Sequence, residues 1–385
     1  LLKVMLGSTG NSSVFRHEGN TTASASSAAV NLAHGSFLRS ITLQRYATAP
    51  RMTRPSTLPA SFLDRPFAVR GDQDFNALAM DLFHLHAQRN PVYRTYLQAL
   101  RRDAEAIRTA EDIPFLPIGL FRTHRVLLEG LEADLRFASS GTTGTVTSTH
   151  HVPFPEVYER SFRTSFEAVY GPVEGYRVLA LLPAYLERPD SSLVYMAERL
   201  IQASGDPESG TWLHDLDGLA ELLQRPASGG RRTLLLGVTF ALLDLAERHP
   251  MPLRDTVVME TGGMKGRRAE LVREEVHALL KEAFQVDAVH SEYGMTELLS
   301  QAWSTGAGVF QCPPWMRVLL REPNDPFARL GPGRTGGIDV IDLCNAASCP
   351  FVSTQDLGRL LPDGRFEVLG RFDHSDLRGC NLMVA

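Results

Sequence analysis

A loop rich in hydroxyls and glycine is the first segment of this chain that could do chemistry. It follows a predicted strand at 135–138 and contains no apolar side chain. Its backbone N–H groups and hydroxyls can surround a phosphate, because glycine lets the main chain approach closely and turn sharply. It lacks the Gly-Lys-Ser/Thr ending of a P-loop, and a polar turn between two strands is the alternative. The candidate phosphate-binding residues are Ser139, Ser140, Gly141, Thr142, Thr143 and Gly144.

A second segment, 292–297, follows a predicted strand and combines an aromatic ring with oxygen ligands. Tyr293 offers a flat face to a base, and the hydroxyl of Thr296, just beyond Gly294, can bond a phosphate. Glu297 can hold Mg²⁺ through oxygen, which is the ligand atom that this ion prefers. The alternative is a turn that carries a surface acid.

Two further polar segments lie near the end of the chain, at 354–358 and 370–373. The first contains Asp356 and the second contains Arg371 followed by Phe372 and an aspartate. An aspartate that follows a strand is well placed to bind ribose hydroxyls. The alternative is an ordinary Asp-Gly turn, which has a similar sequence. Each segment is therefore a weak signal by itself, and the two are considered together with the earlier segments.

In their order, these segments resemble the motifs of the adenylate-forming superfamily, which includes acyl-CoA ligases, luciferases and peptide-synthetase adenylation domains. The resemblance covers roughly 111–385. It implies an α/β fold of the N-terminal-type core, with parallel sheets flanked by helices and a short β-rich C-terminal part. It also implies ATP and Mg²⁺.

The resemblance assigns roles to individual residues. Tyr293 would stack on adenine, Thr296 would bond the α-phosphate and Asp356 would bind ribose. Glu297 would hold Mg²⁺, and a glycine pair would wall the adenine. Besides the hydroxyl-rich loop, the implied nucleotide-binding residues are Gly262, Gly263, Tyr293, Gly294, Thr296, Asp356 and Arg371.

The departures from this pattern resemble a narrower group, the acyl-protein synthetases of the LuxE family, whose members supply fatty acid in bacterial bioluminescence. The usual Pro-Lys after the phosphate loop is missing, and the sequence stops shortly after 370–373, where a C-terminal lid domain is expected. In such an enzyme a long-chain fatty acid is activated as acyl-AMP. Cys380, beside Arg378 and Gly379, would then take the acyl group as a thioester, since a thiolate is nucleophilic and leaves readily.

Other activities fit the same motifs. A CoA ligase of the phenylacetate type would release acyl-CoA without using Cys380, which could instead be a small buried residue. A non-catalytic adenylate-binding scaffold is the alternative outside the enzymes. For the acyl-protein ligase, the implied partner is an acyl-accepting protein such as a fatty-acyl reductase.

Two basic side chains are further catalytic candidates. Lys265 lies beside the glycine pair at a predicted helix start, where it could neutralise phosphate or simply face solvent. His150, next to His151, could approach the acyl-adenylate carbonyl, or both could lie on a surface loop.

Alternating strands and helices must position these residues. Strands are predicted at 178–182, 234–238, 256–259 and 288–290, with helices at 192–201 and 268–284. This alternation predicts parallel sheets with helices on both faces, and short strands follow from about 306. An extended segment at 113–118 is preceded by a helical region, 56–110, with helices from 72 to Pro91 and over 93–107.

Composition sets the remaining limits. The chain has 385 residues, 43% hydrophobic residues and a net charge of −5, which gives no basis for nucleic-acid binding. Its four cysteines favour a reducing compartment, and no apolar run is long enough to span a bilayer. We expect a cytoplasmic protein in which 1–55 is a disordered or spurious extension, with an organelle transit peptide as the alternative.

Overall fold

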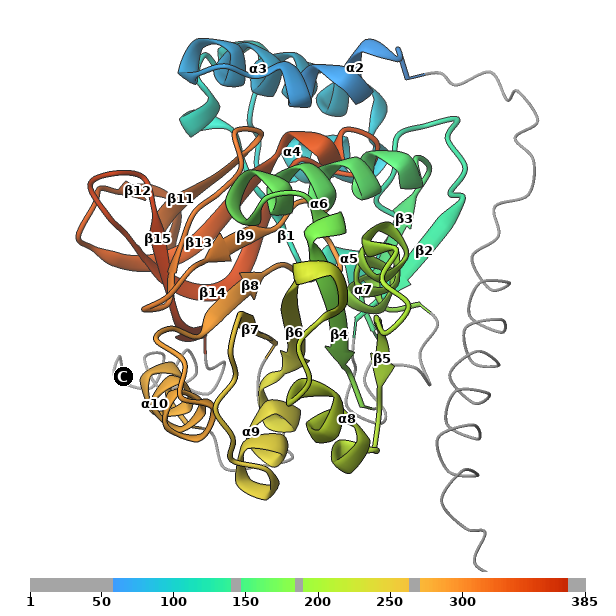
Figure 1. The fold of residues 1–385 in the computed structure, drawn as a ribbon. Coiled ribbons are helices and arrows are strands. Elements are labelled where there is room, and N and C mark those ends of the chain that lie inside the picture. Colours follow the sequence, from blue (N-terminus) through green and yellow to red (C-terminus); the bar gives the residue numbers. More distant parts are fainter. Residues whose placement is uncertain (1–57, 140–146, 184–189, 263–270, 373–385) are drawn as a thin grey trace, which may run out of the picture. The chain divides into compact units, whose positions relative to one another are not determined.

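The computed structural model describes residues 58–139, 147–183, 190–262 and 271–372. The chain divides into two compact units, Leu1–Met52 and Thr53–Ala385. All described residues belong to the second unit, whose elements are labelled in Figure 1.

A six-stranded, mostly parallel sheet forms the centre of the α/β part. Its strand order is β5-β4-β6-β7-β8-β9. Only β9 runs antiparallel to its neighbour. Strands β4, β6 and β7 are almost continuously apolar and buried, as expected for parallel strands covered on both faces. The bounds are β4 (Tyr176–Leu181), β5 (Gly210–Trp212), β6 (Arg232–Val238), β7 (Thr256–Thr261), β8 (His290–Tyr293) and β9 (Ala302–Ser304).

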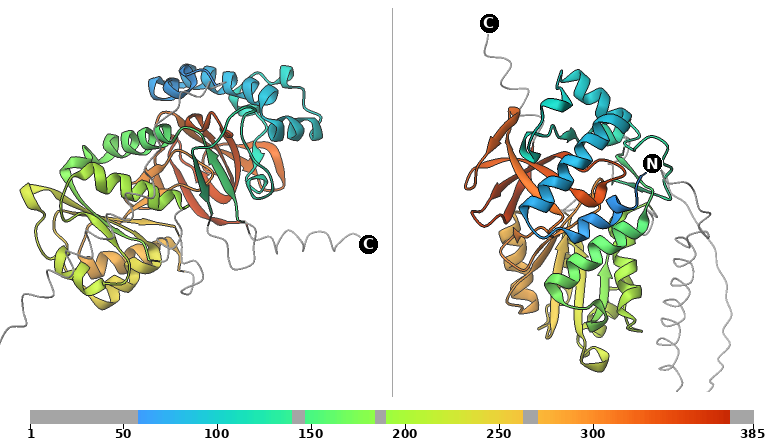
Figure 2. Two further views of the ribbon diagram at one scale, coloured as in Figure 1. Left: turned by 90° about the vertical axis from the view of Figure 1, so that its right-hand side faces the viewer. Right: turned by 90° about the horizontal axis from the view of Figure 1, so that it is seen from above.

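Helices cover both faces of this sheet, as Figure 2 shows. On one face, Tyr170 of α6 contacts His290 of β8. On the other face, His277 of α10 reaches Glu260 and Ser291, whose side chains alternate with those of the first face. The helices are α6 (Pro155–Tyr170), α7 (Ser192–Ser204), α8 (Leu216–Leu223), α9 (Thr239–Arg248) and α10 (Arg273–Phe284).

A second, largely antiparallel sheet is built from the C-terminal strands. Its order is β10-β15-β14-β13-β11-β12, and β1 (Leu116–Pro117) joins β14 in parallel. The strands are β10 (Val309–Phe310), β11 (Met316–Glu322), β12 (Asp325–Leu330), β13 (Thr335–Asp342), β14 (Phe351–Leu360) and β15 (Phe366–Arg371). A short 3-10 helix, η6 (Leu343–Asn345), links β13 to β14.

A separate two-stranded hairpin, β2 (Leu135–Ala138) with β3 (Thr149–Val152), flanks the hydroxyl-rich loop. The predicted strand at 135–138 is therefore confirmed, and the loop connects two antiparallel strands. At its base, Ser139 N donates to Ser148 O, and Ser148 N donates to Ser139 Oγ, both at 3.0 Å.

The N-terminal helices pack against the C-terminal sheet. Helix α3 (Asp72–Arg89) contacts β11 through an Asp72–Arg317 ion pair of 2.6 Å, and Tyr93 of α4 (Pro91–Ala99) packs on Phe351. Two further helices, α2 (Ser61–Asp64) and α5 (Leu120–Thr123), are short. The region 56–110 thus shares a core with the sheet that follows it.

Several predicted boundaries were wrong. The helix expected over 93–107 begins at Pro91, where Asn90 caps it, and ends at Ala99, before Arg101 adopts a φ of 53°. The strand expected at 288–290 begins only at His290 and runs to Tyr293, so 292–293 belong to β8. Asp356 lies inside β14 rather than after a strand, which also excludes the Asp-Gly turn.

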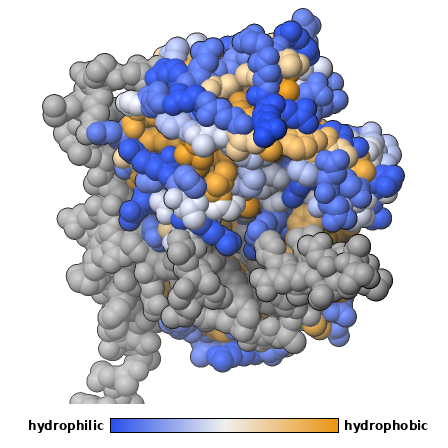
Figure 3. All heavy atoms as spheres, turned by 180° about the vertical axis from the view of Figure 1, so that it is seen from behind, coloured by the Kyte–Doolittle hydropathy of each residue, from blue (hydrophilic) through white to orange (hydrophobic). Residues whose placement is uncertain are grey.

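The predicted fold class is confirmed by both sheets. Among the described residues, no helix is long and apolar enough to cross a membrane. The face seen from behind in Figure 3 is mainly hydrophilic, with apolar patches between the polar areas.

Candidate functional site

Tyr293 ends β8 at the carboxyl edge of the parallel sheet, where ligands bind in open α/β sheets. Its hydroxyl donates to Asp356 Oδ2 of β14 at 3.0 Å. Its ring packs edge-on against Phe366 at 5.4 Å and tilted against Phe310 at 5.9 Å. These aromatic contacts fix the ring between the two sheets.

Asp356 also joins the last two predicted segments. It pairs with Arg371 in the register of β14 and β15, and Arg371 Nε lies 3.2 Å from Asp356 Oδ1. Burial raises the pKa of the Asp356 carboxyl, and the Arg371 guanidinium opposes that rise. Arg371 itself is exposed, so this side of the pair is open to a ligand.

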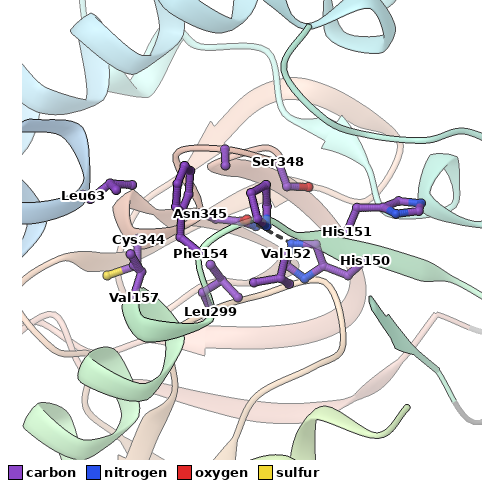
Figure 4. Close-up of a pocket in the computed structure, with 12 residues that line it drawn as sticks. Leu63, His150, His151, Val152, Phe154, Val157, Leu299, Cys344, Asn345 and Ser348 are labelled. Atoms are coloured by element: carbon purple, nitrogen blue, oxygen red, sulfur yellow. Dashed lines mark hydrogen bonds between the residues drawn. The ribbon is translucent and has the colours of Figure 1, made fainter. Parts of the chain in front are cut away.

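A buried network ties the hairpin to Thr296 and Glu297. His150 of β3 faces the Thr296 carbonyl through Nδ1 at 2.8 Å and Asn345 Oδ1 through Nε2 at 3.1 Å. Asn345 Nδ2 donates to the Glu297 carbonyl at 2.8 Å. Figure 4 shows His150 directed toward Asn345, whereas His151 points away. This network brings the base of the hydroxyl-rich loop to the Thr296–Glu297 segment.

Glu297 is 4% exposed and lies beside this loop base. Burial raises the pKa of its carboxyl, whereas hydrogen bonding from Ser148 lowers it. Mg²⁺ in nucleotide sites is held by one or two carboxylates together with substrate phosphates and water. A single carboxylate next to a phosphate-type loop suits that arrangement, so Glu297 fits the predicted metal ligand.

No family model matches the chain, and no curated protein matches it. Among solved structures, an open conformation of 2-hydroxyisobutyryl-CoA ligase in complex with 2-HIB-AMP and CoA gives a TM-score of 0.55. The match has 13% identity and covers 79% of this chain and 70% of that chain. The fold is that of an adenylate-forming enzyme core.

Two other solved structures resemble the chain more distantly. ATP-bound MatB from Rhodopseudomonas palustris gives a TM-score of 0.48 and 18% identity, over 62% of this chain and 48% of that chain. O-succinylbenzoate coenzyme A synthetase from Bacillus subtilis, in complex with ATP and magnesium ion, gives a TM-score of 0.45 and 18% identity. This match covers 62% of this chain and 50% of that chain. The chain therefore spans about half the length of these two proteins.

Within this adenylate-forming fold, His150 differs from the catalytic role expected for it. Its side chain is fully buried, and burial lowers its pKa to about 4. Both ring nitrogens face protein oxygens, and the neutral ring carries one N–H for the two contacts. In this structure the two contacts of His150 hold the Thr296 backbone in place beside the small pocket of Figure 4, which His150 helps to line.

Gly262 directly follows β7 in a left-handed conformation, with a φ of 72°. The Thr239 hydroxyl lies 3.0 Å from the Gly262 carbonyl and 3.1 Å from Glu260 Oε2. Glu260 in turn contacts Arg273 and His277 of α10 at 3.4 Å and 3.6 Å. These contacts anchor the start of the predicted adenine wall.

The three described cysteines are free thiols, and none is suited to nucleophilic attack. Burial raises the pKa of Cys312 and Cys349 to about 12 and that of Cys344 well above its usual value. Cys344 and Cys349 are buried in the core, and Cys312 is half-buried. Several predicted site residues lie outside the described residues: Ser140, Gly141, Thr142, Thr143, Gly144, Gly263, Lys265 and Cys380.

Two functional candidates were missed by the sequence interpretation. Asn345 has no local signature, because it reaches His150 across 195 positions and only the folded chain brings them together. Glu292 did carry a signal, because it is an acid beside a tyrosine in a buried strand.

Proposed function

We propose that this chain activates a carboxylic acid with ATP and Mg²⁺, forming acyl-AMP and pyrophosphate. One observation carries the proposal. The Tyr293–Asp356–Arg371 cluster and the Thr296–Glu297 segment, held by His150, lie at the same edge of an adenylate-forming fold.

In the proposed reaction, a carboxylate oxygen of the substrate attacks the α-phosphorus of ATP. The bond from this phosphorus to the oxygen that bridges to the β-phosphate breaks, and pyrophosphate leaves. Tyr293 and Asp356 would hold the nucleoside, while the Thr296 hydroxyl would hold the α-phosphate. Mg²⁺ at Glu297 would neutralise the phosphate charge that develops during the displacement.

The finer proposal rests on the sequence resemblance. A long-chain fatty acid would be the substrate, and the Cys380 thiolate would attack the acyl carbonyl. The carbon–oxygen bond to AMP would break, leaving an acyl thioester and free AMP. A partner protein, such as a fatty-acyl reductase, would receive the acyl group. The burial of Cys312, Cys344 and Cys349 supports this assignment by leaving Cys380 as the remaining thiol.

A CoA ligase is the second candidate. It is favoured by the likeness to 2-hydroxyisobutyryl-CoA ligase, whose structure contains an acyl-AMP and CoA. In that case CoA would take the place of the Cys380 thiol. The adenylation step and its residues would be the same.

Product analysis tests both stages. Full-length protein is incubated with labelled ATP, Mg²⁺ and a series of carboxylic acids, and acid-dependent AMP and pyrophosphate are expected. Formation of ADP, or no nucleotide product with any acid, would refute carboxylate activation.

The acceptor is identified with labelled palmitate on a denaturing gel. A hydroxylamine-labile protein label that is lost in Cys380→Ala but kept in the control Cys312→Ala supports the acyl-protein ligase. Acyl-CoA formed only when CoA is present, with no protein label, supports the CoA ligase. ATP binding without either product supports a scaffold.

A further inference from the structure

Glu292 occupies an unusual position beside the proposed nucleotide site. Successive side chains of a strand point to opposite faces, so Glu292 and Tyr293 diverge at the end of β8. Tyr293 meets Asp356 of the C-terminal sheet. Glu292 instead lies on the face of α6, next to its parallel register partner Thr261.

The Glu292 carboxyl has one protein donor among the described residues. Thr261 Oγ1 donates to Glu292 Oε2 at 2.5 Å. The other oxygen, Oε1, lies against Gly294, where an added Cβ would approach it to 2.3 Å. Any larger residue at 294 would displace the carboxyl, so Gly294 leaves the space that Glu292 Oε1 occupies.

An acceptor that lacks a donor lies at the same glycine. Gln301 Cγ is 3.2 Å from the same Cβ position on Gly294, and Gln301 is 2% exposed. Its amide oxygen, Oε1, is buried and has no hydrogen-bond partner within the part of the chain that the structure describes. An unpaired buried acceptor is destabilising, so its retention calls for a donor from elsewhere.

Tyr158 of α6 borders both acceptors. Burial raises the pKa of Tyr158 well above its usual value, the nearby Glu292 carboxylate adds to this rise, and the Gln301 amide opposes it. The Tyr158 hydroxyl donates to the Ser192 carbonyl at 3.1 Å, so its proton is committed elsewhere. When Glu292 is ionised, Glu292 and Gln301 thus form a polar pair with more acceptor oxygens than donors.

The pair lies within reach of the reacting centre. Glu292 and Thr296 are separated by four steps of the chain, which span at most about 14 Å. A substrate whose carboxylate lies at the α-phosphate and whose body extends along this segment would reach the pair. A hydroxyl or ammonium group there would donate to Glu292 or to the unpaired Gln301 oxygen, whereas plain alkyl atoms would leave the Gln301 oxygen without a donor.

We propose that Glu292 and Gln301 form a polar subsite that selects a carboxylic acid carrying a hydrogen-bond donor, either a hydroxyl or an ammonium group, several bonds from its carboxylate. This inference rests on the proposed function, since it assumes that the chain adenylates an acid. It narrows the substrate class from the long-chain fatty acids implied by the sequence resemblance to acids that carry a hydroxyl or ammonium substituent.

The test is acid-dependent ATP–pyrophosphate exchange with matched acids. The sets are hexanoate with its 6-hydroxy and 6-amino derivatives, benzoate with its 4-hydroxy and 4-amino derivatives, and decanoate with 10-hydroxydecanoate. In at least one set, kcat/KM for a donor-bearing acid should exceed that for the plain acid by about tenfold or more. A hydroxyl preference and an ammonium preference separate the two donor classes.

Variants assign the preference to the pair. Glu292→Leu should abolish it, and Glu292→Gln should reduce an ammonium preference more than a hydroxyl preference. Glu221→Gln, on the exposed side of α8, should keep the wild-type pattern. Binding of labelled ATP to each variant, measured by equilibrium dialysis, shows that the nucleotide site is intact.

Three outcomes would overturn the inference. Plain acids that are used as well as their donor-bearing counterparts in every set would do so, as would a preference unchanged in Glu292→Leu. If ATP binds but no donor-bearing acid supports exchange, the proposed subsite is refuted, whereas the proposed nucleotide binding is retained. If ATP does not bind at all, the proposed function fails first, and the subsite fails with it.

Discussion

The hydroxyl of Tyr293 donates a hydrogen bond of 3.0 Å to Asp356, which lies 63 positions later in the chain. The bond joins the end of the parallel sheet to the C-terminal antiparallel sheet. Because Arg371 holds the other carboxylate oxygen at 3.2 Å, three of the polar segments found in the sequence meet at one carboxylate.

Replacing this carboxylate should weaken nucleotide binding. Asp356→Asn removes the charge that Arg371 pairs with and the acceptor proposed for ribose, so ATP affinity should fall by about tenfold or more. Tyr293→Phe keeps the ring and removes one neutral hydrogen bond, so a loss of about fivefold is expected. Titration calorimetry measures both. Asp363→Asn is the control, since Asp363 pairs with Arg365 on an exposed turn; an equal effect in all three variants would contradict the assignment.

The His150–Asn345 network should govern how Glu297 uses Mg²⁺. Asn345→Ala removes the donor to the Glu297 carbonyl, so the Mg²⁺ concentration needed for half-maximal activity should rise several-fold. Unfolding free energy should also fall by about 1–3 kcal/mol. Ser348→Ala removes a buried hydrogen bond to Val126 nearby and serves as control. If both variants lose only stability and keep the wild-type Mg²⁺ dependence, the network has no positioning role.

The buried Glu292 carboxyl predicts a specific pH dependence of stability. Burial raises its pKa from 4.5 to about 7, so the folded state binds this proton more tightly than the unfolded state does. The resulting stabilisation is complete below about pH 4.5 and is lost as pH rises through about 7. Between pH 5 and 8 the wild type should lose on the order of 2 kcal/mol more than Glu292→Gln. Urea unfolding across this range measures it, and parallel curves for the two proteins would disprove the assignment.

A second buried carboxylate should be essential for the C-terminal sheet. Asp339 is fully buried between Arg321 and Arg329, at 2.7 Å and 2.5 Å. Arg321 also donates to the Thr354 carbonyl, which lies two residues from Asp356. Asp339→Asn leaves both guanidinium groups without a carboxylate and should cost about 3–5 kcal/mol in urea unfolding. A cost below about 1 kcal/mol would show that the ion pairs are dispensable.

The sequence predicted the parts of this fold that depend on local pattern. The apolar run 234–238 became β6, since a strand buried on both faces needs continuous apolar side chains. The helix predicted at 192–201 became α7, and Ser191 caps its start by accepting from Val194 N. Contacts across the chain were less accessible. Asn345 meets His150 only because η6 and the β2–β3 hairpin fold against the same segment, and no spacing in the sequence encodes that meeting.

The most direct test of the account is titration of the full-length protein with ATP in the presence and absence of Mg²⁺. The account predicts one ATP site per chain, with affinity strengthened by Mg²⁺ in the wild type. Glu297→Gln should lose that strengthening, and Asp356→Asn should weaken binding by about tenfold or more. A wild-type chain that binds no ATP, or variants that bind it as the wild type does with the same Mg²⁺ dependence, would contradict the nucleotide site on which the proposed function rests.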